Sequence, residues 1–209
     1  MRGTGAVCFD FNGTLSLDEE VMYELLAALL ADRGRPLPRE TYFGEFIGLA
    51  DDEIATRWLG VDAADARAVA AERAERYRRL PPDDRIPAAA AAAVRAAAAR
   101  VPVAVVTTSL RGEVEPVLAA AGLGGLISAI VTGDDVLRPK PDPEPYRRAL
   151  ELLGALDGLA FEDTPPGVAS AKRAGLRCCG IVGTVGRDRL CEADVVADAL
   201  TPELVESLL

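Results

Sequence analysis

The sequence contains no histidine in 209 residues. This absence excludes Ser-His and Cys-His nucleophilic mechanisms and any histidine-ligated metal, so an acid, base, nucleophile or ligand must be another side chain. Basic residues are also in the minority, with 23 Lys and Arg against 33 Asp and Glu and a net charge of −10. Such an acidic surface argues against nucleic acid or an anionic membrane as a partner. A phosphorylated ligand would therefore need a local positive site.

Cysteines and long apolar runs are equally scarce. The four cysteines, Cys8, Cys178, Cys179 and Cys191, show no CxxC spacing, and the adjacent pair is poorly placed to form a disulfide. They are interpreted as reduced, small core residues. Arg2 is the only charged residue before the first strand-like run, and no signal-type apolar region is found there. No stretch approaches the roughly 18 apolar residues of a membrane span. A soluble, cytoplasmic protein is expected, as a monomer or a dimer.

Short apolar segments predict the fold. They lack the alternation of half-buried strands, which favours strands buried on both faces of a parallel sheet, and helical patterns separate them. An α/β class is expected, with a Rossmann-like parallel sheet flanked by helices. The segments are 6–9, 103–106, 128–131, 159–161 and 178–182, with a short sixth strand at 194–197.

An insertion interrupts this rhythm between the first and second strands. About ninety residues lie there, where one crossover helix would be enough. Helical patterns fill the interval, which predicts an all-helical cap at 16–82 on a catalytic core made of 1–15 and 83–209. The helices are expected at 18–31, 40–47, 51–58 and 63–77.

Two of the predicted helices carry further detail. The first has Val21, Leu25, Leu26 and Leu29 on one face. The alanine tract at 88–99 could be low-complexity disorder, but alanine has the highest helix propensity and a proline, tolerated in a first helical turn, precedes the tract. A helix is therefore predicted there.

Polar residues at the strand ends indicate a site, because ligands of open α/β sheets bind beyond the carboxyl ends of the strands. Each of these residues alone could cap a helix or end a strand. Together they supply a carboxylate nucleophile, hydroxyl and backbone donors, a cation for phosphoryl oxygens and two acids for a hard divalent metal. The set is Asp10, Asn12, Thr107, Thr108, Ser109, Lys140, Glu162 and Asp163.

Four segments in this order resemble the motifs of the haloacid dehalogenase superfamily. They are "DFNGTL", "VAVVTTS", "RPKPDP" and "FEDTPPGVASAKRAG". The likeness is to the β-phosphoglucomutase and phosphoglycolate-phosphatase branch, in which a helical cap follows the first motif, and it spans nearly the whole chain. It implies a phosphatase-like hydrolase that depends on Mg²⁺ and acts on a small phosphomonoester.

The resemblance also assigns roles to residues. Asp10 would attack phosphorus and form an aspartyl-phosphate, and Thr107 and Lys140 would hold phosphoryl oxygens. The catalytic set it implies is Asp10, Asn12, Thr107 and Lys140. The phosphate-binding set is Asn12, Gly13, Thr107, Thr108 and Lys140.

The implied magnesium site uses the same strand ends. Its ligands would be Asp10, the backbone carbonyl of Asn12 and Asp163, with Glu162 as a direct or water-mediated partner. The Asn-Gly step alone is typical of a hairpin turn. In this context a strand-to-loop elbow is predicted instead, in which Gly13 lets the backbone turn tightly beside the phosphate.

Asn12 departs from the family pattern, which usually has a second aspartate at that position. Asparagine cannot donate or accept the proton, and such help is typically worth about 10² to 10⁴ in rate. The enzyme could use leaving groups that need little protonation, or borrow an acid from the cap. The chain could be a noncatalytic phosphometabolite-binding relative, or an altered form in which an aspartate was replaced. Deamidation of the Asn12-Gly13 step is a fourth, weaker idea.

Other activities of the superfamily fit less well. A haloacid dehalogenase, the third-ranked function, would leave the acidic pair Glu162 and Asp163 unexplained. The mutase pattern has a basic group where this chain has Asp51 and a histidine where it has Met22. In the family's cap, the positions of Met22, Phe43, Phe46 and Ile47 face the substrate, although each could equally pack the cap itself. Their apolar nature favours a small or partly apolar phosphomonoester.

Overall fold

The computed structural model describes residues 5–209 of the chain. Its strands form one parallel sheet in the order β3-β2-β1-β4-β5-β6. The strands are β1 (Val7–Phe9), β2 (Val103–Val106), β3 (Ala129–Val131), β4 (Leu159–Glu162), β5 (Arg177–Ile181) and β6 (Val195–Ala197). This confirms the predicted Rossmann-like fold and the short sixth strand. The strand ends differ from the predicted ones by at most one residue, and one of these differences touches the site, since Glu162 is the last residue of β4 and does not follow the strand.

The central strands align their carboxyl ends at one edge of the sheet. Phe9 of β1 is paired with Val105 of β2 on one side and with Phe161 of β4 on the other. All residues of these three strands are buried, as expected for strands covered on both faces. The register therefore places Asp10 level with Val106 and Glu162, with Thr107 and Asp163 one residue further along their strands.

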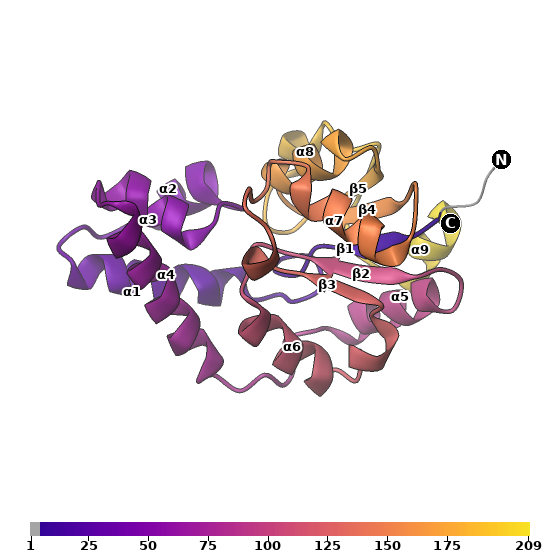
Figure 1. Ribbon diagram of the computed structural model, residues 1–209, viewed down its shortest axis with the longest axis horizontal. Coiled ribbons are helices and arrows are strands. Elements are labelled where there is room, and N and C mark those ends of the chain that lie inside the picture. Colours follow the sequence, from indigo (N-terminus) through magenta and orange to yellow (C-terminus); the bar gives the residue numbers. More distant parts are fainter. Residues whose placement is uncertain (1–4) are drawn as a thin grey trace.

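Helices cover both faces of the sheet (Figure 1). Buried residues of α7 and α8 cluster with the Cys8 face, whereas those of α5, α6 and α9 cluster with the Phe9 face. The alanine tract is helical, as predicted, and its helix begins directly after Pro87. The bounds are α5 (Ala88–Ala98), α6 (Arg111–Ala120), α7 (Glu144–Leu153), α8 (Pro165–Arg173) and α9 (Pro202–Leu208), with 3₁₀ turns at Gly124–Leu126, Gly133–Asp135 and Arg187–Leu190.

A helical lobe lies between β1 and β2, at the left of Figure 1. It consists of α1 (Glu19–Asp32), α2 (Arg39–Thr41), a π-helix η1 (Tyr42–Phe46), α3 (Asp51–Leu59) and α4 (Ala63–Arg78). The helix predicted at 40–47 is thus one short α-turn followed by a π-helix. We call this lobe the cap. Its limits at 16–82 stay a prediction.

The buried face of α1 differs from the predicted one. Met22, Leu26, Leu29 and Leu30 are buried, whereas Val21 and Leu25 are only partly buried. The buried positions follow the i, i+4, i+7, i+8 spacing of a stripe that faces the other cap helices. Leu26 and Leu30 accordingly join one apolar cluster with Ile54 of α3 and Val69 of α4.

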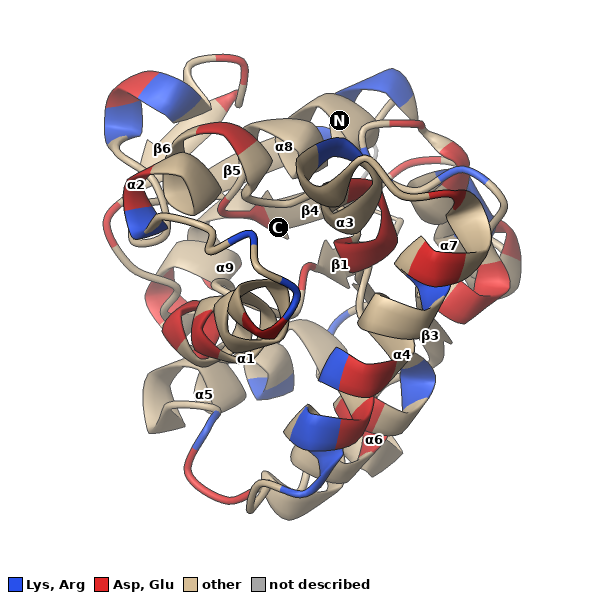
Figure 2. Ribbon diagram, turned by 90° about the vertical axis from the view of Figure 1, so that its left-hand side faces the viewer, with Lys and Arg blue, Asp and Glu red and all other residues tan. Residues whose placement is uncertain are grey.

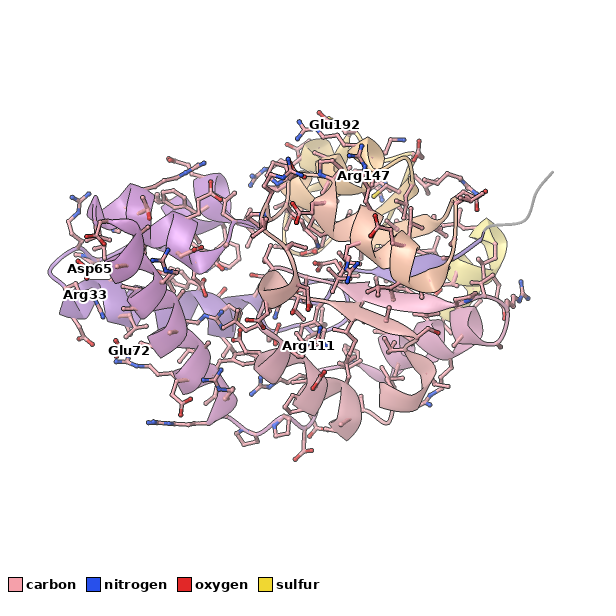
Figure 3. The ribbon with its side chains drawn as sticks, viewed as in Figure 1. Arg33, Asp65, Glu72, Arg111, Arg147 and Glu192 are labelled. Carbon is pink, nitrogen blue, oxygen red and sulfur yellow. The ribbon has the colours of Figure 1, made fainter. Side chains whose placement is uncertain are left out.

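The surface carries charges of both signs, interspersed over α4 and α6 in Figure 2. Figure 3 shows Arg33 and Glu72 at the outer end of the cap, where an ion pair of 2.9 Å joins the end of α1 to α4. Such a partly exposed pair is worth at most about 1 kcal/mol, so apolar packing dominates the cohesion of the cap.

The cysteines fit the predicted core role in three of four cases. Cys8, Cys178 and Cys179 are buried and free, but Cys191 is exposed. Cys191 directly follows a 3₁₀ turn whose buried residue is Leu190, so its side chain points outward. Between residues 5 and 209, the structure has no helix with the length and hydropathy needed to cross a bilayer.

Candidate active site

Lys140 stands at the centre of a buried charged cluster. Its ammonium group donates to Oδ1 of Asp10 at 2.6 Å, to Oε1 of Glu162 at 2.6 Å and to the carbonyl of Val106 at 2.9 Å. All three of its protons are thereby used. Asp10 comes directly after β1, and its N–H donates to the carbonyl of Phe161 at 2.9 Å. The sheet register thus brings together residues that are up to 152 positions apart.

The charges of this cluster are unbalanced. Burial alone would lower the pKa of Lys140, but the carboxylates of Asp10 and Glu162 raise it above its ordinary value. Burial raises the pKa of Asp10 to about 7, against the opposing effect of Lys140, and the charge of Asp163 adds to the rise. The single positive charge of Lys140 therefore does not balance the carboxyl groups of Asp10, Glu162 and Asp163 when all three are ionised.

Asp10, Glu162 and Asp163 form an acidic group that could hold a metal ion. Each offers one carboxylate oxygen, and the three oxygens lie within 4.8 Å of one another. Burial raises the pKa of Glu162 and of Asp163 to about 7. Among residues 5–209, neither Oε2 of Glu162 nor Oδ2 of Asp163 has a hydrogen-bond partner, although both are buried. Orphaned buried oxygens of this kind suit a hard divalent cation, so the residues fit Mg²⁺.

Glycine is required at two positions around the carboxylates. Gly13 has φ +80°, and a Cβ there would overlap the carboxylate of Asp163. A Cβ on Gly167 would likewise overlap the carboxylate of Glu162. The elbow after β1 is thus the predicted tight turn, and it makes room for an acid of the cluster.

Asn12 is held in one orientation by its neighbours. Its Nδ2 donates to Oδ1 of Asp18 at 2.9 Å, and the hydroxyl of Ser109 donates to its Oδ1 at 2.6 Å. The hydroxyl of Tyr77, on α4, donates to the second carboxylate oxygen of Asp18. A carboxylate acceptor on one side and a hydroxyl donor on the other match an amide. The sequence prediction missed Asp18 and Tyr77 as members of this network.

The remaining predicted phosphate-binding residues divide into two groups. Thr107 is buried and Thr108 partly buried, and both line the cavity above Asp10. Gly13 instead lines a neighbouring cleft, and its N–H already donates to the carbonyl of Ser16 at 2.7 Å. The structure therefore does not bring Gly13 into this cavity.

The cavity lies between core and cap and is small. Its volume is about 40 Å³, enough for a few waters but far too small for a sugar phosphate. In this arrangement of cap and core, the cavity has no room for a molecule of that size. The lining consists of Asp10, Asn12, Glu19, Met22, Tyr42, Gly48, Leu49, Ala50, Asp51, Arg73, Thr107, Thr108, Ser109, Lys140 and Thr164.

Arg73 brings a cation from the cap into this cavity. Its Nε donates to Oδ2 of Asp51 at 2.6 Å, within the cap. It also pairs with Glu113 of α6, so it connects the cap to the core. The guanidinium is buried, and burial, which lowers its pKa, is outweighed by the two carboxylates, which raise it. Sequence inspection missed this residue, which lies in a run of mixed charges without a motif.

The apolar cap residues proposed to face the substrate have different surroundings. Met22 lines the cavity, and its sulfur lies 3.3 Å from Nη1 of Arg73. Phe46 and Ile47 are buried in the apolar cluster that the cap helices share with the Cys8 face of the sheet, and Phe43 lines the neighbouring cleft. Of the four, only Met22 is placed to touch a ligand beside Asp10.

Comparison with known proteins agrees with this geometry. The model of the haloacid dehalogenase-like hydrolase family matches residues 7–181. The chain therefore belongs to this family, and it is an enzyme related to the phosphatases within it.

Individual relatives cover different shares of the chain. It is 35% identical over 210 residues to a phosphoglycolate phosphatase of Cupriavidus necator, with 93% of this chain and 89% of the relative covered. It is 42% identical over 104 residues to validoxylamine A 7'-phosphate phosphatase of Streptomyces hygroscopicus subsp. limoneus, but there the match spans only 49% of each chain. A solved structure of CbbY from Rhodobacter sphaeroides in complex with xylulose-(1,5)bisphosphate has a TM-score of 0.79 at 28% identity and covers 94% of this chain and 95% of that one.

Proposed function

We propose that this protein is a Mg²⁺-dependent phosphatase that hydrolyses a small phosphomonoester through an aspartyl-phosphate on Asp10. The observation that carries the proposal is the cluster of Asp10, Lys140, Glu162 and Asp163, in which two buried carboxylate oxygens have no partner among the described residues. The names of the relatives, which act on phosphorylated small molecules, support it.

The residues of the chain divide the chemistry among them. Asp10 is the nucleophile, and Lys140 holds its carboxylate in place while it offers positive charge to phosphoryl oxygens. Thr107 adds a hydroxyl donor at the next strand end. Phosphoryl transfer needs mainly in-line positioning and charge neutralisation, and a cluster at aligned strand ends meets both needs.

Asp10, the backbone carbonyl of Asn12 and Asp163 would hold Mg²⁺, with Glu162 beside them. Thr14 orients this set, because its hydroxyl donates to Oδ1 of Asp163 at 3.0 Å. When bound, Mg²⁺ supplies charge that offsets the phosphoryl oxygens during transfer. Lys140 remains paired with Glu162 and keeps that acid fixed beside the site.

The cap selects the substrate by closing over the cavity. It contributes the cation of Arg73 and the apolar side chain of Met22, which together favour a small phosphomonoester with some apolar surface. A panel in which only highly charged sugar bisphosphates react would contradict this preference.

A second candidate function is phosphometabolite binding without catalysis. The observation that favours it is Asn12, which stands where an acid would protonate the leaving group. The amide can still accept and donate hydrogen bonds, so a bound phosphate is compatible with either function.

Phosphate release from a panel of phosphomonoesters distinguishes the two functions. The panel runs from activated aryl phosphates to sugar phosphates, with and without Mg²⁺. We expect release that depends on Mg²⁺ and is abolished by Asp10→Asn. Binding of phosphate esters without release by the unaltered chain would favour the noncatalytic function, above all if only Asn12→Asp restored turnover. Release that persists in Asp10→Asn would refute the proposed nucleophile.

A further inference from the structure

The fixed amide of Asn12 leaves the proposed reaction without a proton donor at the usual place. Asp18 and Ser109 satisfy the amide with hydrogen bonds of 2.9 and 2.6 Å. An amide neither donates its proton to an alkoxide nor accepts one from water at neutral pH. If the chain hydrolyses esters whose leaving group must be protonated, another group has to supply that proton in the cavity.

Three carboxyl side chains line the cavity: Asp10, Glu19 and Asp51. Asp10 is the nucleophile. Asp51 is already engaged by Arg73, whose Nε donates to its Oδ2 at 2.6 Å. Glu19 has no cationic partner among residues 5–209, and its carboxyl group accepts one long hydrogen bond, of 3.5 Å, from the hydroxyl of Tyr42.

Asp18, the neighbouring acid, is already committed. It is buried and does not line the cavity. One carboxylate oxygen accepts from Asn12 and the other from Tyr77. Both of its oxygens are therefore occupied by donors of the protein, and neither faces a ligand.

We propose that Glu19 is the general acid and base of this enzyme and replaces the carboxyl group that is missing at Asn12. This inference rests on the proposed phosphatase function. Glu19 is the first residue of α1, where the chain enters the cap, so it is carried on the lobe that closes over the nucleophile. It lines both the cavity above Asp10 and the adjacent cleft, which gives it access to a leaving group and to water.

The electrostatic surroundings of Glu19 agree with a proton donor. Burial, followed by the charges of Asp163, Asp18, Asp10 and Asp51, raises the pKa of its carboxyl group well above the ordinary value. The cations that line the same cavities are engaged elsewhere. Lys140 is held by Asp10 and Glu162, Arg73 by Asp51 and Glu113, and Arg39 by Glu20.

Both half-reactions then balance. In the first, an Asp10 oxygen bonds to phosphorus as the ester P–O bond breaks, and the Glu19 carboxyl group gives its proton to the departing alcohol oxygen. In the second, the Glu19 carboxylate takes a proton from water as the water oxygen bonds to phosphorus and the Asp10–phosphorus bond breaks. Inorganic phosphate leaves, and Glu19 is protonated again.

The test uses the full chain with Mg²⁺ and 4-nitrophenyl phosphate, whose leaving group needs no protonation. Glu19→Gln should still release a rapid burst of one nitrophenolate per active site, because attack by Asp10 is intact. Steady-state turnover should then fall by about 10² to 10⁴, and phosphorylated protein should accumulate. With an alkyl phosphate such as glycerol phosphate, the leaving alcohol needs the proton, so Glu19→Gln should show no rapid formation of phosphorylated protein. Glu20→Gln is the matched control, since the adjacent Glu20 is exposed and paired with Arg39, and it should behave like the unaltered chain.

Two further variants separate a catalytic role from a structural one. Added formate should restore part of the turnover of Glu19→Ala, by supplying the missing carboxyl group. In the Glu19→Gln background, exchange of amide and carboxyl by Asn12→Asp with Asp18→Asn should also restore turnover.

The outcomes distinguish the two proposals. If Glu19→Gln has an unchanged Tm and full turnover while Asp10→Asn is inactive, the role of Glu19 is refuted and the phosphatase function stands. Equal loss of burst and turnover, without rescue by formate or by the exchange, also refutes the role of Glu19. If the unaltered chain gives no nitrophenolate that depends on Asp10, both proposals fail.

Discussion

The two sides of the cavity contrast in how closely they follow the family pattern. On the nucleophile side, Asp10, Lys140, Glu162 and Asp163 follow the motifs and form one buried charged cluster. On the side of Asn12, an amide replaces the expected acid and is bonded to Asp18 and Ser109. The first side supports formation of a phosphoenzyme. The second side shows that the amide of Asn12 has neighbours that match it, an acceptor in Asp18 and a donor in Ser109.

The largest expected effect comes from breaking the nucleophile side at Lys140. In Lys140→Met the carboxylates of Asp10 and Glu162 lose their shared cation, which should abolish measurable turnover. Removing one partner of a buried pair typically lowers the free energy of unfolding by about 3 to 5 kcal/mol. Urea titration of the metal-free protein at pH 8 measures this change.

Lys172→Met is the matched control for that experiment. Lys172 pairs with Asp194 at 2.5 Å on the partly exposed surface, so the loss should be below about 1 kcal/mol. Equal losses in the two variants would show that Lys140 has no special role in balancing the acids.

The Asn12 side can be sharpened with a double-mutant cycle. Asn12→Asp places a second carboxylate against Asp18 and should lower the free energy of unfolding by about 1 to 3 kcal/mol. Asp18→Asn should recover most of that loss, since it restores one donor and one acceptor. The coupling energy from urea titrations of the four proteins measures the match. Additive effects would mean that Asn12 and Asp18 do not interact as described.

A pH series compares the acidic cluster with and without Mg²⁺. The pKa values of Asp10, Glu162 and Asp163 are raised to about 7 from 3.8 or 4.5, so the folded protein binds more protons than the unfolded chain within that window. Their contribution to stability is therefore present at low pH and is lost as the pH rises through about 7 in the absence of metal.

Mg²⁺ requires these groups ionised, so its effect should have the opposite pH dependence. Below pH 7, the apparent affinity of the protein for Mg²⁺ should rise about tenfold per unit increase in pH for each proton that the ion displaces. The shift in Tm at a fixed Mg²⁺ concentration should therefore grow from pH 5 to 8. Asp163→Asn should remove most of that shift. A shift in the unaltered protein that does not change with pH would argue against these carboxyls as ligands.

The smallest effect is expected where cap and core meet. Glu113→Gln weakens the pair with Arg73 but leaves Arg73 bonded to Asp51. The cap should open more readily, and KM for a reactive phosphomonoester should change a few-fold with kcat nearly constant. Steady-state kinetics measure this split, and a large loss of kcat alone would instead place Glu113 in the chemistry.

The nucleophile side of the cavity could be predicted from the sequence, and most of the Asn12 side could not. The apolar runs at 103–106 and 159–161 lack alternation, and polar residues follow them directly, so the sheet and the acidic cluster were predictable from local patterns and motif order. Ser109, which donates to Asn12, was also among the predicted strand-end residues, whereas Asp18 and Tyr77 were not predicted. Tyr77 lies 59 positions from Asp18, and only the packing of α4 beside α1 brings the two together. Tertiary packing also decided which face of α1 is buried and why Cys191 is exposed.

Detection of the phosphoenzyme tests the central claim most directly. The protein would be mixed with Mg²⁺ and 4-nitrophenyl phosphate, quenched in acid during turnover and mapped by mass spectrometry. A phosphoryl group on the peptide that contains Asp10, absent from Asp10→Asn and from samples without Mg²⁺, is the predicted result. Release of phosphate with no phosphorylated peptide, or with the phosphoryl group on another residue, would contradict the claim.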